Sequence, residues 1–256
     1  MILSVVTAVH SGARQYLGAA YESLVDQELP DGWNWEWCIQ EDGLDVDSRS
    51  CLPNPDDARI RIGASRTGGP AVARTMAFAR STGSLIKVLD ADDVLPAGAL
   101  SREITVLTDQ ASVGWTTCRV LDLLPDGSTA GYGGDPEPGL MPRGVVFDYW
   151  QTTRRPQVHP ATLCVRRELV SLLGGWMAIP ASEDTGLLTA LSVLSDGWFL
   201  PEVGLHYRQH EAQSTKHPSH REGDEWAARM DIIESRARAL AAFLEARPAA
   251  NHVEGR

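Results

Sequence analysis

The chain has 256 residues, 43% of them hydrophobic, which is enough to bury the core of one large domain. Its formal net charge of −11 at pH 7 argues against a nucleic-acid-binding surface and against electrostatic docking on anionic lipid. The sequence shows no signal peptide, no apolar run near the ~20 residues of a membrane span and no C-x-x-C pair, so we expect a cytoplasmic protein with reduced thiols.

The first part of the chain alternates between expected strands and expected helices. Apolar runs rich in β-branched residues predict strands over 2–9, 35–39, 60–62 and 85–89. The spacing of apolar residues predicts helices over 14–27 and 70–81, and Pro70 suits the first turn of the second one. This alternation is typical of an α/β fold with a doubly wound, mostly parallel, Rossmann-like sheet.

The second part of the chain is less regular. Its pattern predicts strands over 113–121, 157–165 and 198–207, helices over 97–107, 167–173, 185–194 and 226–246, and a long exposed loop over 125–144. Ser182 is the expected N-cap of the helix that starts near Thr185. We divide the chain into two halves of one domain, 1–110 and 111–210, followed by a mobile segment and C-terminal helix over 211–256.

An apolar strand pattern ends abruptly in the acidic cluster Asp90-Ala91-Asp92-Asp93. Asp90 and Asp92 are two residues apart, so in an extended chain their carboxylates project from the same side. Carboxylates at the C-terminal end of a buried strand lie where open α/β sheets bind ligands. Because neighbouring carboxylates repel each other, the cluster favours a bound divalent cation, with a solvated loop or a helix start as the alternative.

Seven short motifs follow one another along the chain, in a fixed order and at plausible separations. They comprise residues 4–11, residues 23–27, Glu41-Asp42-Gly43, residues 69–74, residues 89–93 with Pro96, Gly174-Gly175-Trp176 with Glu183-Asp184, and Tyr207-Arg208-Gln209-His210 with Ser214. This series resembles the inverting family 2 glycosyltransferases of the GT-A fold. The resemblance covers about residues 1 to 210 and implies a GT-A sheet, followed here by a C-terminal helical extension.

Two positions depart from the pattern of the family that the chain resembles. Thr75 stands where the family has Asn, and Glu183-Asp184 is followed by Thr185-Gly186-Leu187 in place of W-D-L. Both departures lie where the family recognises donor and acceptor. They therefore bear on the identity of the sugar more than on the class of reaction.

The resemblance implies a nucleotide-diphosphate sugar as the donor. It assigns donor binding to Thr7, Glu41, Asp42, Arg74 and Asp90. Within this set, Asp42 would accept a hydrogen bond from the nucleobase and Asp90 would touch the ribose. Taken by itself, Asp42 also suits a turn before Gly43, and Arg74 also suits a solvent-facing helix position.

The same resemblance implies a metal cofactor, Mg²⁺ or Mn²⁺. The expected ligands are Asp92, Asp90 and His210. A hard cation held there would bridge the oxygens of the donor pyrophosphate and stabilise it as the leaving group. As a lone His in a polar segment, His210 also fits a solvated side chain.

Inversion at the anomeric carbon requires a base on the side opposite the leaving group. By resemblance Asp184 is that base, and Glu183 orients the acceptor or the donor. The alternative for Asp184 is an acid at a helix start, where it interacts favourably with the helix dipole. The acceptor is unknown: a small molecule, a glycan or a lipid-linked precursor would each fit, no nucleic-acid partner is expected, and an oligomer is possible.

Two other functions compete with sugar transfer. A sugar-nucleotide nucleotidyltransferase needs a glycine-rich phosphate loop after the first strand, and His10-Ser11-Gly12-Ala13-Arg14 is poor in glycine. A non-catalytic nucleotide-sugar-binding protein on the same fold is disfavoured by the intact set Asp42, Asp90, Asp92 and Asp184.

We also expect the polar, His-rich residues 206–225 to close over the donor as a lid.

Overall fold

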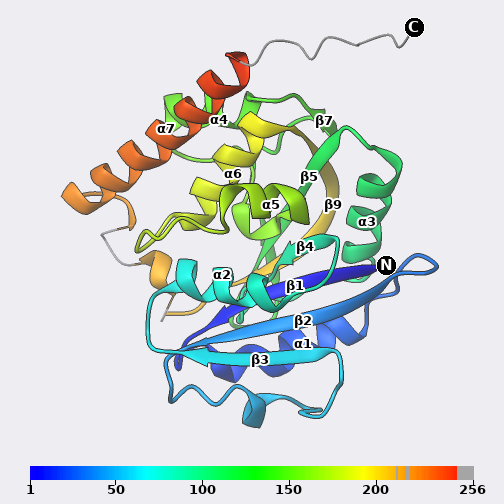
Figure 1. The fold of residues 1–256 in the computed structure, drawn as a ribbon. Coiled ribbons are helices and arrows are strands. Elements are labelled where there is room, and N and C mark those ends of the chain that lie inside the picture. Colours follow the sequence, from blue (N-terminus) through cyan, green and yellow to red (C-terminus); the bar gives the residue numbers. More distant parts are fainter. Residues whose placement is uncertain (212, 217–219, 247–256) are drawn as a thin grey trace, which may run out of the picture.

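The computed structural model describes residues 1–211, 213–216 and 220–246. Within these residues, nine strands form one sheet in the order β3-β2-β1-β4-β8-β5-β9-β7, and β6 pairs with β5 (Figure 1). The strands are β1 (Ile2–Val9), β2 (Asn34–Asp42), β3 (Ile60–Ser65), β4 (Leu85–Val88), β5 (Val113–Leu123), β6 (Thr129–Gly131), β7 (Gly139–Met141), β8 (Cys164–Arg166) and β9 (Asp196–Arg208).

Helices cover both faces of this sheet (Figure 1). The α-helices are α1 (Leu17–Val25), α2 (Pro70–Arg80), α3 (Ala99–Asp109), α4 (Val145–Thr153), α5 (Arg167–Leu173), α6 (Glu183–Leu194) and α7 (Asp224–Glu245). Short 3₁₀ turns are η1 (Arg14–Tyr16), η2 (Arg49–Cys51), η3 (Pro160–Thr162) and η4 (Ser214–Lys216). The expected α/β architecture is therefore confirmed.

The first half of the sheet is parallel, as the alternating pattern predicts. β1 pairs in parallel with both β2 and β4, and β2 pairs in parallel with β3. β1, β2 and β4 are almost wholly buried, which explains their largely apolar sequences, whereas the edge strand β3 is partly exposed. Since they run the same way, the ends of β2 and β4 that carry acids lie at the same edge of the sheet. The second half is mixed, because β8 runs antiparallel between β4 and β5 while β5 and β9 are parallel.

The core is divided by the sheet into layers. One apolar cluster lies between the sheet and helices α1 and α3, and a second lies between the sheet and helices α2, α5 and α6. A third cluster joins α4, α6 and α7 through Trp150, Val193, Met230 and Ile233. Helix α7 is thus packed on α6, the helix that begins with Glu183 and Asp184.

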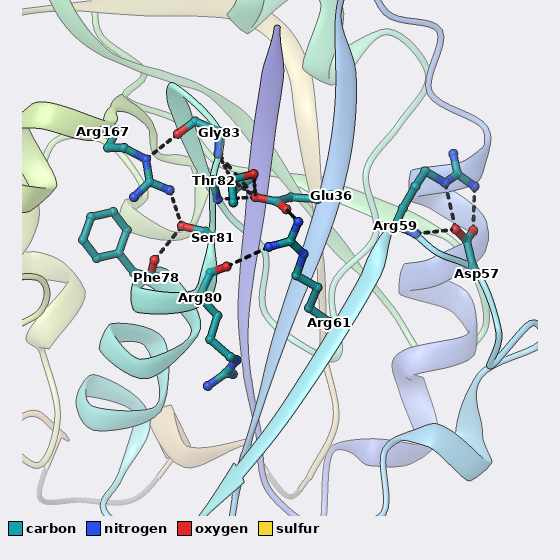
Figure 2. Close-up of polar contacts among 11 residues, drawn as sticks. Glu36, Asp57, Arg59, Arg61, Phe78, Arg80, Ser81, Thr82, Gly83 and Arg167 are labelled. Carbon is teal, nitrogen blue, oxygen red and sulfur yellow. Dashed lines mark hydrogen bonds and ion pairs between the residues drawn. The ribbon is translucent and has the colours of Figure 1, made fainter.

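The turn from α2 into β4 is fixed at the edge of the sheet opposite the acids (Figure 2). The buried Glu36 carboxylate accepts hydrogen bonds from the Ser4 hydroxyl at 2.6 Å and the Thr82 hydroxyl at 3.0 Å, and pairs with Arg61 at 3.0 Å. Burial raises the pKa of Glu36, but these bonds outweigh it and leave the pKa below its usual value. A Cβ at Gly83 would come within 2.5 Å of the Ile2 carbonyl oxygen, so this close approach requires glycine.

Two predictions for the second half are wrong, and one helix lies where the sequence pattern predicts no element. Residues 157–165 do not form one strand, because β8 spans only Cys164–Arg166 and is preceded by η3. The loop over 125–144 contains the short strands β6 and β7. Helix α4 was not expected at all: its β-branched and aromatic residues have weak helix propensity, and packing on α6 and α7 decides its structure.

Candidate active site

A cleft of about 1210 Å³ opens at the edge of the sheet where the acidic strand ends lie. Asp42 comes from the end of β2, while Asp90 and Asp92 follow β4 directly. The cleft is lined by these acids together with Arg74 of α2, Glu183 and Asp184 of α6 and His210 after β9. Segments far apart in sequence thus bring most of the expected site residues to one cavity.

Arg74 links Asp90, which lies just after β4, to helix α6. Arg74 is 6% exposed, and its guanidinium donates to Asp90 through Nη2 and to Glu183 through Nη1. Burial lowers the pKa of Arg74, but the charges of Asp90, Glu183 and Asp184 outweigh it and raise the pKa above its ordinary value. The alternative of a solvent-facing helix charge is therefore wrong for Arg74.

Glu183 and Asp184 differ in their surroundings although they are neighbours at the start of α6. Glu183 is 4% exposed, and burial raises its pKa to about 7 against the opposing charge of Arg74. Asp184 is partly exposed in the cleft, and its Oδ1 accepts a hydrogen bond from the Thr185 N–H at 2.6 Å. Of the two carboxylates, Asp184 is the one open to a bound molecule.

Ser182 occupies the N-cap position of helix α6 as expected, but it does not cap the helix through its side chain. Its φ of 62° lies in the left-handed region, and its side chain makes no capping hydrogen bond. The Ser182 hydroxyl instead accepts a hydrogen bond at 3.0 Å from Arg229 of α7, a buried residue. A serine held in this conformation next to Glu183 and Asp184 is typical of backbone strain at a functional site.

Asp92 and His210 contact each other within the cleft. Asp92 Oδ2 lies 2.8 Å from His210 Nε2, and the Asp92 carbonyl accepts a hydrogen bond from Arg208 Nε at 2.7 Å. The expected ligand set is therefore only partly assembled: Asp92 and His210 are together, while Asp90 bonds to Arg74. Among the described residues, no group of three or more His, Cys, Asp or Glu side chains is arranged to hold a metal.

Asp93, the third acid of the cluster, is fully buried beneath the site. Its Oδ1 accepts a hydrogen bond from the Arg208 N–H at 2.9 Å, while its Oδ2 is buried without a partner. Burial, with the charges of Asp90 and Asp92, raises the pKa of Asp93 well above its usual value. Asp93 thus attaches the end of β9 to the acidic loop.

Three residues expected to bind the donor have partners within the protein. Asp42 lines the cleft, but its carboxylate accepts hydrogen bonds from the Gly68 N–H at 2.6 Å and the Gly69 N–H at 3.1 Å. Thr7 and Glu41 are buried outside the cleft lining: Thr7 Oγ1 donates to the Leu89 carbonyl at 2.6 Å, and Glu41 Oε1 accepts from the Ser48 N–H at 2.6 Å. Direct contact of Thr7 and Glu41 with a donor stays a prediction.

The cleft also contains residues that sequence reasoning missed. His159 and Trp226 line it, as do Arg154 and Arg155 at the end of α4. The sequence pattern predicts a strand over 157–165, which contains His159, and it predicts α7 as a C-terminal extension of the domain. The sequence did contain one signal against a strand at His159: the next residue, Pro160, cannot donate a ladder hydrogen bond, and it begins η3.

The expected lid, residues 206–225, lies partly outside the described residues. Its described part begins within β9 and includes η4. Several of its residues line the cleft, namely Tyr207, Gln209, His210, Gln213, Thr215, Lys216, His220 and Arg221. The segment is therefore in position to contact a bound molecule, and its closure stays a prediction.

A search of the described residues for membrane spans finds no helix with the length and apolar character needed to cross a bilayer. The longest helix of this part of the chain, α7, carries charged residues along its length.

Comparisons with known proteins agree with this geometry. The family model described as Glycosyl transferase family 2 matches residues 4–128. No curated protein matches the chain significantly. Among solved structures, S. aureus TarS 1-349 superposes with a TM-score of 0.68 at 15% identity, covering 94% of this chain and 70% of that chain. Its complex with UDP-GlcNAc gives 0.68 at 15% identity (96% and 72%), and its complex with UDP gives 0.66 at 15% identity (96% and 71%).

These matches confirm the resemblance drawn from the motifs. The family match contains Asp42, Arg74, Asp90 and Asp92, and the structural match extends over nearly the whole chain. Residues 4–128 thus match the family model described as Glycosyl transferase family 2, and the chain has the GT-A type fold of the matched structures.

Proposed function

We propose that the protein is a glycosyltransferase that moves a sugar from a nucleotide-diphosphate donor to an acceptor hydroxyl, with inversion at the anomeric carbon. The observation that carries this proposal is the meeting of two sets of acids in one cleft. Asp90 and Asp92 follow the strand β4, and Glu183 and Asp184 begin the helix α6 on the far side of Arg74. The family match over residues 4–128 supports the same reaction class.

The donor would bind on the β4 side of the cleft. Asp42 and Asp90 would contact the nucleoside, and Arg74 would keep Asp90 in place through its ion pair. The matched S. aureus structures with UDP and UDP-GlcNAc support a nucleotide sugar as the donor class. The cleft is also roomy enough for such a molecule, at about 1210 Å³.

Asp92 and His210 fit the role of metal ligands for Mg²⁺ or Mn²⁺. A carboxylate and an imidazole 2.8 Å apart offer oxygen and nitrogen donors in one place, and donor phosphates and water supply the remaining ligands that such ions require. When bound there, the cation would neutralise charge on the leaving pyrophosphate. The protein would contribute the placement of Asp92, whose backbone is fixed by Arg208.

Asp184 is the residue that we assign as general base. Asp184 is partly exposed in the cleft, where an acceptor hydroxyl can approach its carboxylate and give up its proton as the oxygen attacks the anomeric carbon. Glu183 is a poorer candidate because it is buried and already bonded to Arg74. Glu183 would instead hold Arg74 and, through it, Asp90.

The test is a screen of donors with and without metal. We expect one of UDP, GDP and dTDP to bind in the presence of Mg²⁺ or Mn²⁺, and the corresponding nucleotide sugar to be turned over to nucleotide diphosphate. Binding without any turnover, in the presence of small-molecule, glycan and lipid-linked acceptors, would favour the non-catalytic alternative. Release of pyrophosphate from a nucleoside triphosphate and a sugar phosphate would favour the nucleotidyltransferase.

A further inference from the structure

His159 is a cleft residue that none of the expected roles covers. It precedes η3 directly and lines the cavity that holds Asp90 and Asp184. Its ring lies against that of Tyr207, with centroids 4.8 Å apart and planes tilted by 53°. The imidazole therefore packs against Tyr207 on one face, and its edge lines the cleft.

The backbone of His159 is held by a chain of buried contacts. Its carbonyl accepts hydrogen bonds from the Thr162 N–H at 3.0 Å and the Thr162 hydroxyl at 2.7 Å. The Thr162 carbonyl in turn accepts from Lys87 Nζ at 2.7 Å, and Lys87 pairs with Glu103 at 2.5 Å in the fully buried core. Because Lys87 lies on β4, His159 is anchored to the same strand that leads to Asp90.

One ring nitrogen of His159 has no hydrogen-bond partner within the protein. Nδ1 is buried and has no partner, which leaves Nε2 as the nitrogen that meets the cleft. Burial lowers the pKa of His159, although Asp184, Asp90 and Asp122 oppose this shift with their charges. A neutral imidazole carries one N–H, and an orphan buried N–H is less well tolerated than an orphan acceptor, so the proton belongs on Nε2.

We propose that His159 binds a hydroxyl of the transferred sugar through Nε2–H. This inference rests on the proposed function, which places the donor beside Asp90 and the attacking acceptor beside Asp184. The transferred sugar must lie between these two carboxylates, where His159 faces the cleft. An uncharged hydroxyl is the fitting ligand, because a phosphate would be repelled by the carboxylates of Asp90, Asp122 and Asp184 around this position.

The experiment compares bare nucleotides with sugar nucleotides by calorimetry, using UDP with UDP-GlcNAc, GDP with GDP-mannose and dTDP with dTDP-glucose. His159→Phe keeps a ring against Tyr207 but cannot donate, whereas His159→Gln keeps an N–H at a similar distance from the backbone. We expect His159→Phe to raise the ratio of sugar-nucleotide Kd to bare-nucleotide Kd about three- to tenfold, the size of one lost hydrogen bond. His159→Gln should raise it less, and both variants should bind bare nucleotide as the wild type does.

His206→Phe is the matched control, since His206 is a half-buried histidine of β9 outside the cleft lining. It should leave the ratio unchanged. An unchanged ratio in both His159 variants would overturn the role of His159 alone. Weaker binding of bare nucleotide by either variant would also overturn it, because His159 would then act on the nucleotide or the fold. A wild type that binds none of these molecules would instead contradict the proposed function, and this inference with it.

Discussion

Arg74 shows how single residues connect the two sides of the cleft. One buried guanidinium bonds to Asp90 after β4 and to Glu183 at the start of α6. Burying charged groups such as those of Arg74 and Glu183 is costly unless they are paired, and removing one partner leaves an uncompensated charge. The network therefore ties the position of Asp90 to the helix that carries the proposed base.

The raised pKa of Glu183 predicts a pH-dependent stability. With a pKa of about 7 in the folded protein, Glu183 still holds its proton at pH values where the unfolded chain has released it. Rising pH therefore lowers the free energy of unfolding through Glu183, from its unfolded pKa near 4.5 up to about 7. In Glu183→Gln this contribution is absent, so urea unfolding at pH 5 and pH 7.5 should show a smaller loss of stability for the variant.

Glu234→Gln is the control for this measurement. Its bonds to Arg238, Arg154 and Gln151, acting against slight burial, lower the pKa of Glu234 to about 2. Glu234 is therefore ionised throughout the window from pH 5 to pH 7.5 and should not change the slope. Identical slopes for the wild type and Glu183→Gln would show that the burial of Glu183 does not perturb its ionisation.

Asp92 predicts the metal dependence of donor binding. If Asp92 and His210 hold the cation, Mn²⁺ should strengthen the binding of the nucleotide diphosphate to the wild type, and Asp92→Asn should remove most of that gain, about tenfold or more. Titration of nucleotide with Mn²⁺ and with EDTA measures it. Asp126→Asn, in the exposed turn between β5 and β6, should keep the full gain. Equal affinity and turnover of the wild type in EDTA would contradict a metal-assisted reaction.

The acids of the site could be named from the sequence, but their partners could not. Asp90, Asp92 and Asp184 stand in recognisable motifs, and each lines the cleft. The bonds from Asp42 to the N–H groups of Gly68 and Gly69 depend on how β2 and the loop before α2 meet. Thr75, which departs from the family pattern, accepts a hydrogen bond from the Trp176 N–H at 3.1 Å, a contact across about a hundred residues of sequence.

Helix α7 illustrates what a whole element contributes. It packs on α6 through an apolar cluster and extends Arg229 to the Ser182 hydroxyl. Ser182 is one of the non-glycine residues with positive φ, at 62°, and it immediately precedes Glu183 and Asp184. The C-terminal helix therefore belongs structurally to the site, although its sequence suggested a separate extension.

Removing the Arg229 contact should affect the site through Ser182. Arg229→Met deletes the bond to the Ser182 hydroxyl and should destabilise the protein by about 2–4 kcal/mol and lower kcat more than it raises KM. Adding Ser182→Gly should recover part of the loss in kcat, because glycine adopts the left-handed conformation without a Cβ penalty. Urea unfolding and steady-state kinetics of the single and double variants form the cycle.

Arg238→Met is the control on the same helix. Arg238 is exposed and pairs with Glu234 one turn away, so its loss should cost only about 0.5 kcal/mol and leave kcat unchanged. Strictly additive effects of Arg229→Met and Ser182→Gly on kcat would contradict the coupling of α7 to the start of α6.

Element prediction succeeded where local pattern and packing agree. The parallel strands β1 to β4 and helix α2 follow from apolar periodicity and from Pro70, and the structure confirms them. It failed where contacts distant in sequence decide the outcome. Residues 145–153 are β-branched and aromatic yet helical because Phe147 and Trp150 fill the cluster with α6 and α7, and residues 157–163 turn because Pro160 opens η3.

The whole molecule divides the proposed work between its two halves. The family match ends at residue 128, so it contains Asp42, Arg74, Asp90 and Asp92 but not Glu183 or Asp184. The strand–helix alternation of the first half could be read from the sequence, and with it the edge at which the acids lie. The proposed acceptor side depends on mixed strands and on α7, whose positions only the folded chain sets.

The central claim is that Asp184 takes the proton of the acceptor hydroxyl, and Asp184→Asn tests it most directly. Asn preserves size and hydrogen bonding but cannot accept the proton, so kcat for sugar transfer should fall about 10²–10⁴-fold while donor affinity stays within about twofold. Asp148→Asn, at an exposed acid in the first turn of α4, controls for the loss of a helix-start charge and should transfer at the wild-type rate. Transfer by Asp184→Asn at the wild-type rate would contradict the assignment of Asp184 as the base. If, in addition, Glu183→Gln were inactive, the role of general base would be assigned to Glu183.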